Sequence, residues 1–271
     1  MAMRRWLVLA VVGWLLAGCA AAVAPVRQFV KGDELAFYDF TQAGTFEEGT
    51  YSDGEARLQV RDGVYRMIVT EGDSVVWYGQ WGEPYRDVVI DVEARQITES
   101  ENTVYGVMCR ARGRVGRPAD DPPLAAESMP ETETTAEPEA EATLAAEATA
   151  EPTAEVTAEP EAAVQPNNGD GYLFLVDGAG RFAIMRSRGR SVVPLVDWSP
   201  SDQIKRGAAQ NQIRAVCLGD YLALYVNGQF MGDAIDDAYT QGQVGLAAAA
   251  SGRLGITVEF DNLTVSSVSA R

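Results

Sequence analysis

The chain has 271 residues, 46% of them hydrophobic, and it carries a formal net charge of −17 at pH 7 without a single histidine. The lack of histidine excludes Ser-His-Asp and Cys-His catalytic systems and histidine-ligated zinc or iron. An acidic chain without a basic patch is also unsuited to nucleic acid as a partner.

The N-terminus has the pattern of an export signal. Two arginines precede an apolar run over residues 6–16, and small residues then lead to Cys19. The run is shorter than the roughly 20 apolar residues that span a bilayer. The motif LAGC resembles the lipobox of bacterial lipoproteins, which implies a signal peptide over 1–18 and a lipid on Cys19 that anchors the exported protein to the cell membrane. The alternative is an ordinary secretory signal cut near Ala22 or Ala24.

Beyond the signal, the chain consists mainly of short alternating runs separated by Gly, Asp and Asn turns. Gly219-Asp220 and Asn227-Gly228 lie between such runs and favour tight hairpin turns. Many short strands with turns about every ten residues predict an all-β, two-sheet antiparallel sandwich of the jelly-roll type. The expected strands cover residues 35–40, 63–72, 74–81, 86–95 and 103–112, and then 172–178, 181–186, 191–196, 211–219, 221–228, 229–235, 242–250 and 254–265.

Residues 118–168 differ abruptly from their surroundings, because Ala, Glu, Pro and Thr dominate and no aromatic residue occurs. Thirteen acidic residues and no Lys or Arg lie there, so the rest of the chain carries a net charge of only −4. Such a segment buries too little apolar surface to offset its ordering entropy, and we predict that it is disordered. The alternatives are an O-glycosylated stalk and a docking tail for basic partners.

The strands that flank this acidic segment share a period-two pattern and would form a hairpin if the segment were deleted. We therefore interpret the segment as an insertion at a loop tip, where long insertions cost little. The expected organisation is one β-sandwich domain over 35–268, interrupted by 118–168 and preceded by a tether over 19–34.

Two cysteines, Cys109 and Cys217, remain once Cys19 is lipidated or removed. Two thiols in an oxidising compartment are expected to pair. In both strands the cysteine shares a face with apolar residues, so both sulfurs point toward the apolar side of the sandwich. We predict a structural disulfide, with two free buried thiols as the alternative. A catalytic thiolate is not expected, because no histidine is present to activate it.

The last expected strand changes its inward face. Its apolar positions are even-numbered through Phe260 and odd-numbered from Leu263 onward. A β-bulge at Asp261-Asn262 would restore the register, so we predict one there.

The run N-x-I-R-A-V-C-x-G-x-x-L-A-L-Y-V-N-G over 211–228, followed by GQVGLAA and VEFDNLTV, resembles concanavalin A-like jelly rolls. The resemblance is greatest to laminin G-like and DUF1080-type domains of bacterial lipoproteins, and it covers about residues 35–268 without the acidic segment. This group contains carbohydrate-binding modules, protein-binding modules and glycoside-active enzymes, so the resemblance implies a fold and not an activity.

The family-16 glycosidases of this group carry an E-x-D-x-x-E strand, and Glu259 and Asp261 match its first two acids. The third position is Thr264, which is not an acid. We therefore expect Asp261 and Asn262 to be bulge and hydrogen-bonding residues. Some DUF1080 relatives are described as keto-glycoside hydrolases, which keeps a hydrolase that uses two carboxylates as the alternative.

Relatives of this kind often bind Ca²⁺ through carboxylates and carbonyls near the rim of a sheet. The resemblance makes Asp39, Asp177 and Asp261 candidate ligands, with exposed turn aspartates as the commoner explanation. No EF-hand or RTX-type repeat is present, and no other cofactor is expected.

Aromatic side chains are the candidates for stacking against sugar rings. Trp77, Tyr78 and Trp81 lie close together in sequence, and Trp198 lies in an irregular segment. Alternation places Trp77 and Tyr78 on opposite faces of their strand, so at least one of them should belong to the core.

These features predict an exported, lipid-anchored, non-catalytic binding or adhesion module for glycans or another surface protein. One alternative is a glycoside hydrolase on the same fold that uses Asp and Glu carboxylates. The other is a structural surface protein whose acidic segment keeps its neighbours apart.

Overall fold

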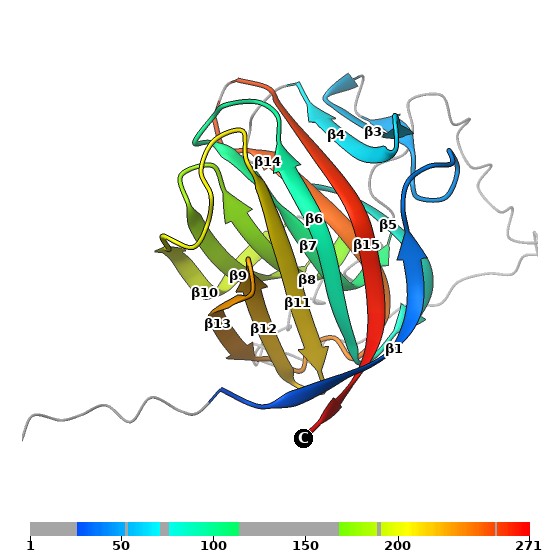
Figure 1. Cartoon of the computed structure of the whole chain (residues 1–271), viewed down its shortest axis with the longest axis vertical. Helices are drawn as coiled ribbons and strands as arrows, with labels where there is room; N and C mark the ends of the chain where they lie inside the picture. Colours follow the sequence, from blue (N-terminus) through cyan, green and yellow to red (C-terminus); the bar gives the residue numbers. More distant parts are fainter. Residues whose placement is uncertain (1–25, 52–53, 71–75, 114–167, 189–190, 253) are drawn as a thin grey trace, which may run out of the picture.

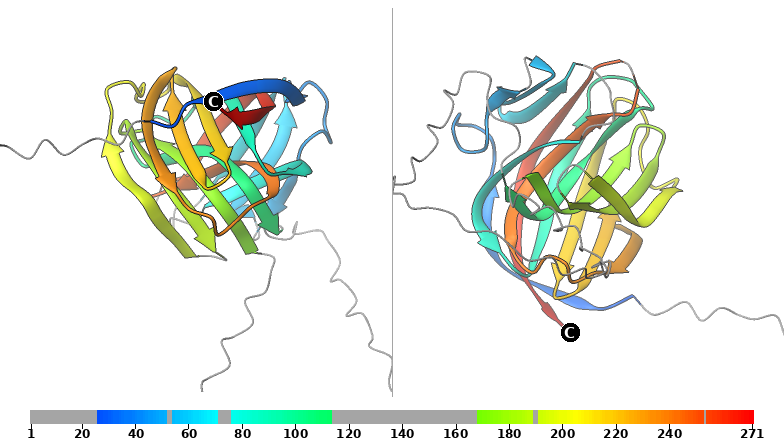
Figure 2. Two further views of the ribbon diagram at one scale, coloured as in Figure 1. Left: turned by 90° about the horizontal axis from the view of Figure 1, so that it is seen from below. Right: turned by 180° about the vertical axis from the view of Figure 1, so that it is seen from behind.

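The computed structural model describes residues 26–51, 54–70, 76–113, 168–188, 191–252 and 254–271. Within these ranges every labelled element is a strand, and the strands form two antiparallel sheets. The two sheets lie face to face as layers, as the views in Figure 1 and Figure 2 show. The prediction of an all-β sandwich is confirmed.

The larger layer, sheet A, has nine strands, and β1 (Phe29–Tyr38) joins it by pairing with β15. The order of the other strands is β13 (Gln229–Ile235), β12 (Tyr221–Val226), β11 (Gln210–Leu218), β6 (Val88–Gln96), β15 (Ile256–Ala270), β4 (Val64–Val69), β3 (Ala56–Arg61) and β2 (Gly49–Tyr51).

The smaller layer, sheet B, has six strands. Their order is β10 (Ser191–Pro200), β9 (Arg181–Arg188), β8 (Asn168–Asp177), β7 (Thr103–Gly113), β14 (Gly242–Ala250) and β5 (Trp77–Tyr85). As expected for the flanks of the acidic segment, β7 and β8 pair antiparallel, and Gly113 lies opposite Asn168. Residues 114–167 themselves lie outside the described residues.

Two short strands of sheet A, β2 and β3, were not expected from the sequence. In β3 only Ala56 and Leu58 are fully buried, so the apolar alternation is weak. The strand forms because it makes a tight hairpin with β4 through Asp62 and Gly63, which both adopt a positive φ. Such a turn matches the twist of the two strands that it joins.

The first strand begins earlier than expected. The sequence predicts a tether over 19–34, but β1 starts at Phe29, and its first residues pair with the end of β15. The polar run Gly32-Asp33-Glu34 resembles a turn in the sequence, and it coincides with a shift in the register between β1 and β15. Pairing with a distant strand therefore overrides the local pattern.

The bulge in β15 is confirmed. The register between β15 and β6 shifts between Asp261 and Thr264, and Asn262 has a φ of 53°. Phe260 and Leu263 are both buried, so the shift lets both halves of the strand face the core.

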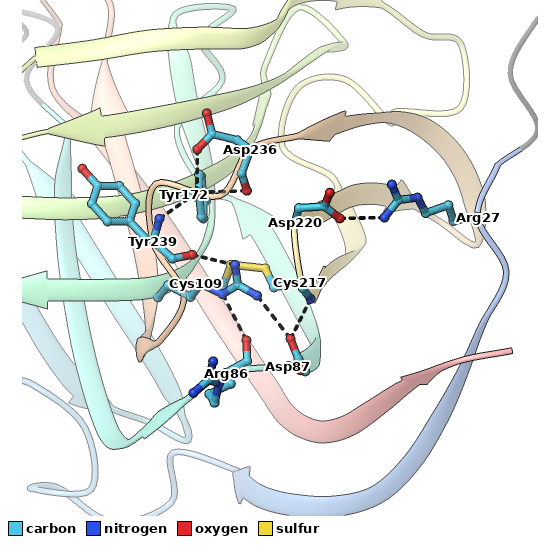
Figure 3. A network of polar contacts seen from close by, with 11 residues as sticks. Arg27, Arg86, Asp87, Cys109, Tyr172, Cys217, Asp220, Asp236 and Tyr239 are labelled. Carbon is cyan, nitrogen blue, oxygen red and sulfur yellow. Dashed lines mark hydrogen bonds and ion pairs between the residues drawn. A yellow bond between two sulfur atoms is a disulfide. The ribbon is translucent and has the colours of Figure 1, made fainter.

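The disulfide between Cys109 and Cys217 is also confirmed. It joins β7 of sheet B to β11 of sheet A, and both residues are fully buried. Beside the bridge, the buried guanidinium of Arg110 donates to the carbonyls of Arg86 (3.0 Å) and Tyr239 (2.6 Å). Figure 3 shows Arg86 and Tyr239 near the disulfide. The disulfide links the two layers at β11, the strand that contributes two side chains to the candidate site.

Candidate functional site

The outer face of sheet A carries a groove. In β11, Ile213 and Cys217 are buried in the core, whereas Gln212 and Arg214, on either side of Ile213, face outward because side chains alternate along a strand. The groove has a volume of about 290 Å³. Its side chains come from five strands, namely Lys31 of β1, Asp91 and Glu93 of β6, Gln212 and Arg214 of β11, Tyr225 of β12 and Asn262 of β15.

Asp91 binds two cations in the groove. Its Oδ2 lies 2.7 Å from Lys31 Nζ, and its Oδ1 lies 2.6 Å from Arg214 Nε. Arg214 meets Asp91 because the two residues are register partners on β11 and β6. Two positive charges on one carboxylate leave this group of three residues, the Asp91 cluster, with a net charge of +1.

Glu93 and Asp261 form the second charged feature of the groove region. They are register partners on β6 and β15, and no Lys or Arg nitrogen of the described residues lies within 4.0 Å of either carboxylate. Glu93 accepts a hydrogen bond from the amide of Gln210 at 2.7 Å. Like charges directly opposite each other on neighbouring strands are destabilising, so this pair has an energetic cost.

The surroundings of Asp261 favour its protonated form. Burial raises the pKa of Asp261, the backbone N–H of Asn262 opposes this by donating to its carboxylate at 2.7 Å, and the charges of Glu93 and Asp39 raise the pKa further. A carboxyl group with a raised pKa beside a second carboxylate can hold a proton that an isolated aspartate would release.

An aromatic ring forms another part of the groove wall. Tyr225 is half-buried and is the register partner of Arg214 on the next strand. Its ring makes edge contacts with Phe29 at 6.0 Å and with Phe230 at 5.4 Å between ring centroids. Neighbouring rings fix the orientation of Tyr225, so an apolar surface lies next to the charged side chains.

A smaller hollow of about 170 Å³ adjoins the groove and shares Glu93 with it. It contains Glu259, whose Oε1 accepts hydrogen bonds from Arg66 Nε (2.9 Å) and Nη2 (2.6 Å). The guanidinium neutralises this carboxylate. Thr264, at the third position of the acidic motif, lies opposite Asp91 in the register.

The structure does not bring the four candidate aromatic residues together. Trp77 and Tyr78 are each 7% exposed and belong to the core, where Trp77 packs against Tyr51. Trp81 is 41% exposed on β5, whereas Trp198 lies on β10 beneath the guanidinium of Arg181. Since β5 and β10 are opposite edges of sheet B, these four residues do not form one sugar-binding platform.

The three candidate metal ligands are also divided. Asp177 is fully buried in sheet B, where it accepts hydrogen bonds from the backbone N–H and Nε of Arg181. Asp39 accepts two hydrogen bonds from Thr41, which lower the pKa of Asp39. Of the three, only Asp39 and Asp261 interact, because the charge of Asp39 raises the pKa of Asp261. Among the described residues, no group of three or more Asp, Glu or Cys side chains could hold a metal ion.

The lipidation candidate, Cys19, lies outside the described residues. Within the described ranges, no helix is long and apolar enough to cross a membrane.

Sequence reasoning did not find the residues of the groove, although one signal was available. The alternation that places Cys217 in the core also places Gln212 and Arg214 on the outer face. Asp91 and Glu93 are their register partners on β6 and so lie on the same face. Lys31 carried no such signal, because it reaches the groove through an irregular strand. The bulge at Asn262 was predicted, but its neighbours across the sheet were not.

No protein-family model matches the chain, and no curated protein matches its sequence. Solved structures do match. A protein of unknown function with a galectin-like fold from Bacillus subtilis is 12% identical, with a TM-score of 0.52, over 90% of this chain and 100% of that one. A β-glucanase from Bacillus licheniformis is 8% identical, with a TM-score of 0.51, over 85% of this chain and 96% of that one.

A carbohydrate-binding module from Bacillus subtilis also matches, with 12% identity and a TM-score of 0.44 over 87% of this chain and 98% of that one. At such low identities the similarities establish the fold alone. The chain has the jelly-roll β-sandwich, or concanavalin A-like, fold that its sequence predicted. Its membership of the DUF1080 or laminin G-like groups stays a prediction.

Proposed function

We propose that the protein is an exported, lipid-anchored, non-catalytic module that binds glycans in the groove of sheet A. The observation that carries this proposal is the half-buried ring of Tyr225 beside an ordered set of charged and amide side chains in the groove of about 290 Å³. Sugar rings present apolar faces that pack on aromatic rings, and their hydroxyl groups bond to polar side chains alongside.

The position of the groove supports this function further. Most of its side chains project from strands of the sheet, which hold binding groups more precisely than loops do. The β-glucanase with the same fold supports a glycan ligand by analogy only. Export and the lipid on Cys19 are supported by the N-terminal sequence pattern.

A glycan array probed with the mature protein tests the proposal. We expect binding to one class of oligosaccharide, and Tyr225→Ala should weaken it by about tenfold or more, because truncating an aromatic anchor commonly costs over 1 kcal/mol. Tyr225→Phe keeps the ring and should retain most of the affinity.

The matched control is Phe37→Ala, which removes an aromatic side chain that is 49% exposed on β1 and does not line the groove. Glycan binding should survive this change. Absence of binding to every glycan, or equal binding by the wild type and Tyr225→Ala, would contradict the proposal.

The raised pKa of Asp261 beside Glu93 favours a second candidate function, glycoside hydrolysis, which requires a carboxyl group that stays protonated near a second carboxylate. Two observations weigh against it: Arg66 neutralises Glu259, and Thr264 replaces the third acid. Reducing-sugar release from the bound glycans is therefore expected to be absent. Activity that is abolished by Asp261→Asn would favour the hydrolase.

A further inference from the structure

The N-terminal arm, residues 27–31, contributes Lys31 to the groove. Arg27, Phe29 and Lys31 alternate along the arm, and all three contact the outer face of sheet A. Figure 1 shows the start of β1 running across one end of the sheet. Lys31 reaches Asp91 of β6 only because the arm crosses the sheet in this way.

The Asp91 cluster presents two cations side by side. Each oxygen of Asp91 binds one cation, which holds Lys31 and Arg214 together despite their mutual repulsion. Arg214 uses only Nε, and among the described residues neither of its Nη atoms makes a hydrogen bond. The side chains of Lys31 and Arg214 are 36% and 42% exposed, so a ligand can reach their remaining donors.

The neighbouring row of side chains has the opposite charge. Glu93 and Asp261 are register partners without a cation, and their oxygens can accept hydrogen bonds. The groove is therefore polarised. Donors with a net charge of +1 lie at the Asp91 cluster beside Tyr225, and acceptors lie at Glu93 in the groove and at Asp261 in the adjoining hollow.

Resting on the proposed glycan-binding function, we propose that the groove selects glycans that contain a hexuronic acid. Such a sugar carries a carboxylate on C5 and hydroxyl donors on C2 and C3, across the ring from it. The carboxylate binds the free donors of Lys31 and Arg214, and the guanidinium can engage both of its oxygens. The ring packs on Tyr225, and the opposite hydroxyl groups donate to Glu93 and Asp261.

Titration calorimetry with matched ligands tests this selectivity. The probes are trimers of galacturonic acid and of glucuronic acid, each compared with its methyl ester, which retains the ring and its hydroxyl groups but carries no charge. We expect the free acid of at least one pair to bind tenfold or more tightly than its ester. Lys31→Gln and Arg214→Gln should each reduce this ratio, and the double variant should abolish it.

Arg61→Gln is the matched control, because Arg61 is an exposed cation of β3 that, within the described ranges, pairs only with Asp62 and does not line the groove. It should leave the ratio unchanged. If Arg61→Gln lowered the ratio of acid to ester affinity as much as Arg214→Gln does, the inference would be overturned. Long-range charge alone would then explain the preference for the free acid. Thermal unfolding of each variant confirms that it is folded.

Other outcomes also overturn the inference while leaving the proposed function intact. These are equal binding of acid and ester, and tighter binding of a glucosamine trimer that depends on Glu93. Failure of the proposed function is distinguishable, because it appears as the absence of any glycan binding that is sensitive to Tyr225→Ala.

Discussion

The carboxylates on the outer face of sheet A occupy two different electrostatic settings. Asp91 is bound by Lys31 and Arg214, whereas Asp261 lies opposite Glu93 with no cation of the described residues within 4.0 Å. Folding therefore places two carboxylates side by side that are compensated by hydrogen bonds but, among the described residues, by no neighbouring cation. Local conflicts of this kind are expected where a surface serves binding rather than stability.

The raised pKa of Asp261 gives a prediction about stability. Because the folded state holds the proton more tightly than the unfolded chain does, ionisation of Asp261 destabilises the fold as the pH rises through its raised pKa. Asp261→Asn should therefore raise the free energy of unfolding at pH 7. The gain in stability should vanish at pH values below the ordinary aspartate pKa of 3.8, where Asp261 is protonated in both the folded and the unfolded state.

Urea unfolding of the wild type and Asp261→Asn between pH 3 and pH 7 measures this difference. Asp197→Asn, an exposed change on β10 of the other sheet, controls for the loss of one negative charge. A wild type that is more stable than Asp261→Asn at pH 7 would contradict the prediction.

At the scale of the elements, β15 organises the outer face of sheet A. It pairs with β6 on one side and with both β4 and β1 on the other. The bulge at Asp261 and Asn262 keeps both halves of this strand buried on the inner face. The same bulge places Asn262 in the wall of the groove.

The positive φ of Asn262 predicts how the bulge responds to substitution. Asn262→Val should lower the free energy of unfolding by about 1–2 kcal/mol relative to Asn262→Gly, because a β-branched residue is disfavoured in the left-handed region. Both variants lose the side-chain amide of Asn262, so the difference between them measures the cost of the left-handed backbone conformation. Equal denaturation midpoints for the two would show that the bulge relaxes into another conformation.

At the scale of the whole molecule, the Cys109–Cys217 disulfide joins the two layers. Cys109 precedes the acidic segment and Cys217 follows it, and the bond spans a sequence separation of 108 residues. Closing so long a loop restricts the unfolded chain more than the folded one. The bond therefore holds together the parts of the sandwich that lie on either side of residues 118–168.

Replacing both cysteines, in Cys109→Ala/Cys217→Ala, should lower the free energy of unfolding by about 2–5 kcal/mol. Guanidinium unfolding without reductant measures the loss, and the wild type in reductant should approach the stability of the double variant. A loss below about 1 kcal/mol would mean that the unfolded chain is already compact.

Features of the fold that depend on side-chain parity could be predicted from the sequence. Alternation along a strand is a local property, so it identified the face of Cys109 and Cys217 and the bulge after Phe260. Alternation did not identify β3, where the pattern is weak. It also did not show that β1 begins at Phe29, within the predicted tether, because β1 is stabilised by a partner more than 200 residues away.

The sequence by itself determined the two-sheet fold, the disulfide and the bulge, because period-two patterns and oxidised cysteine pairs are readable along the chain. Only the tertiary structure decided the site. Trp81 and Trp198 are on opposite edges of sheet B, while Lys31, Asp91 and Tyr225 meet on sheet A. The order of strands in a sheet is set by long-range pairing, and no local pattern encodes which side chains become neighbours across it.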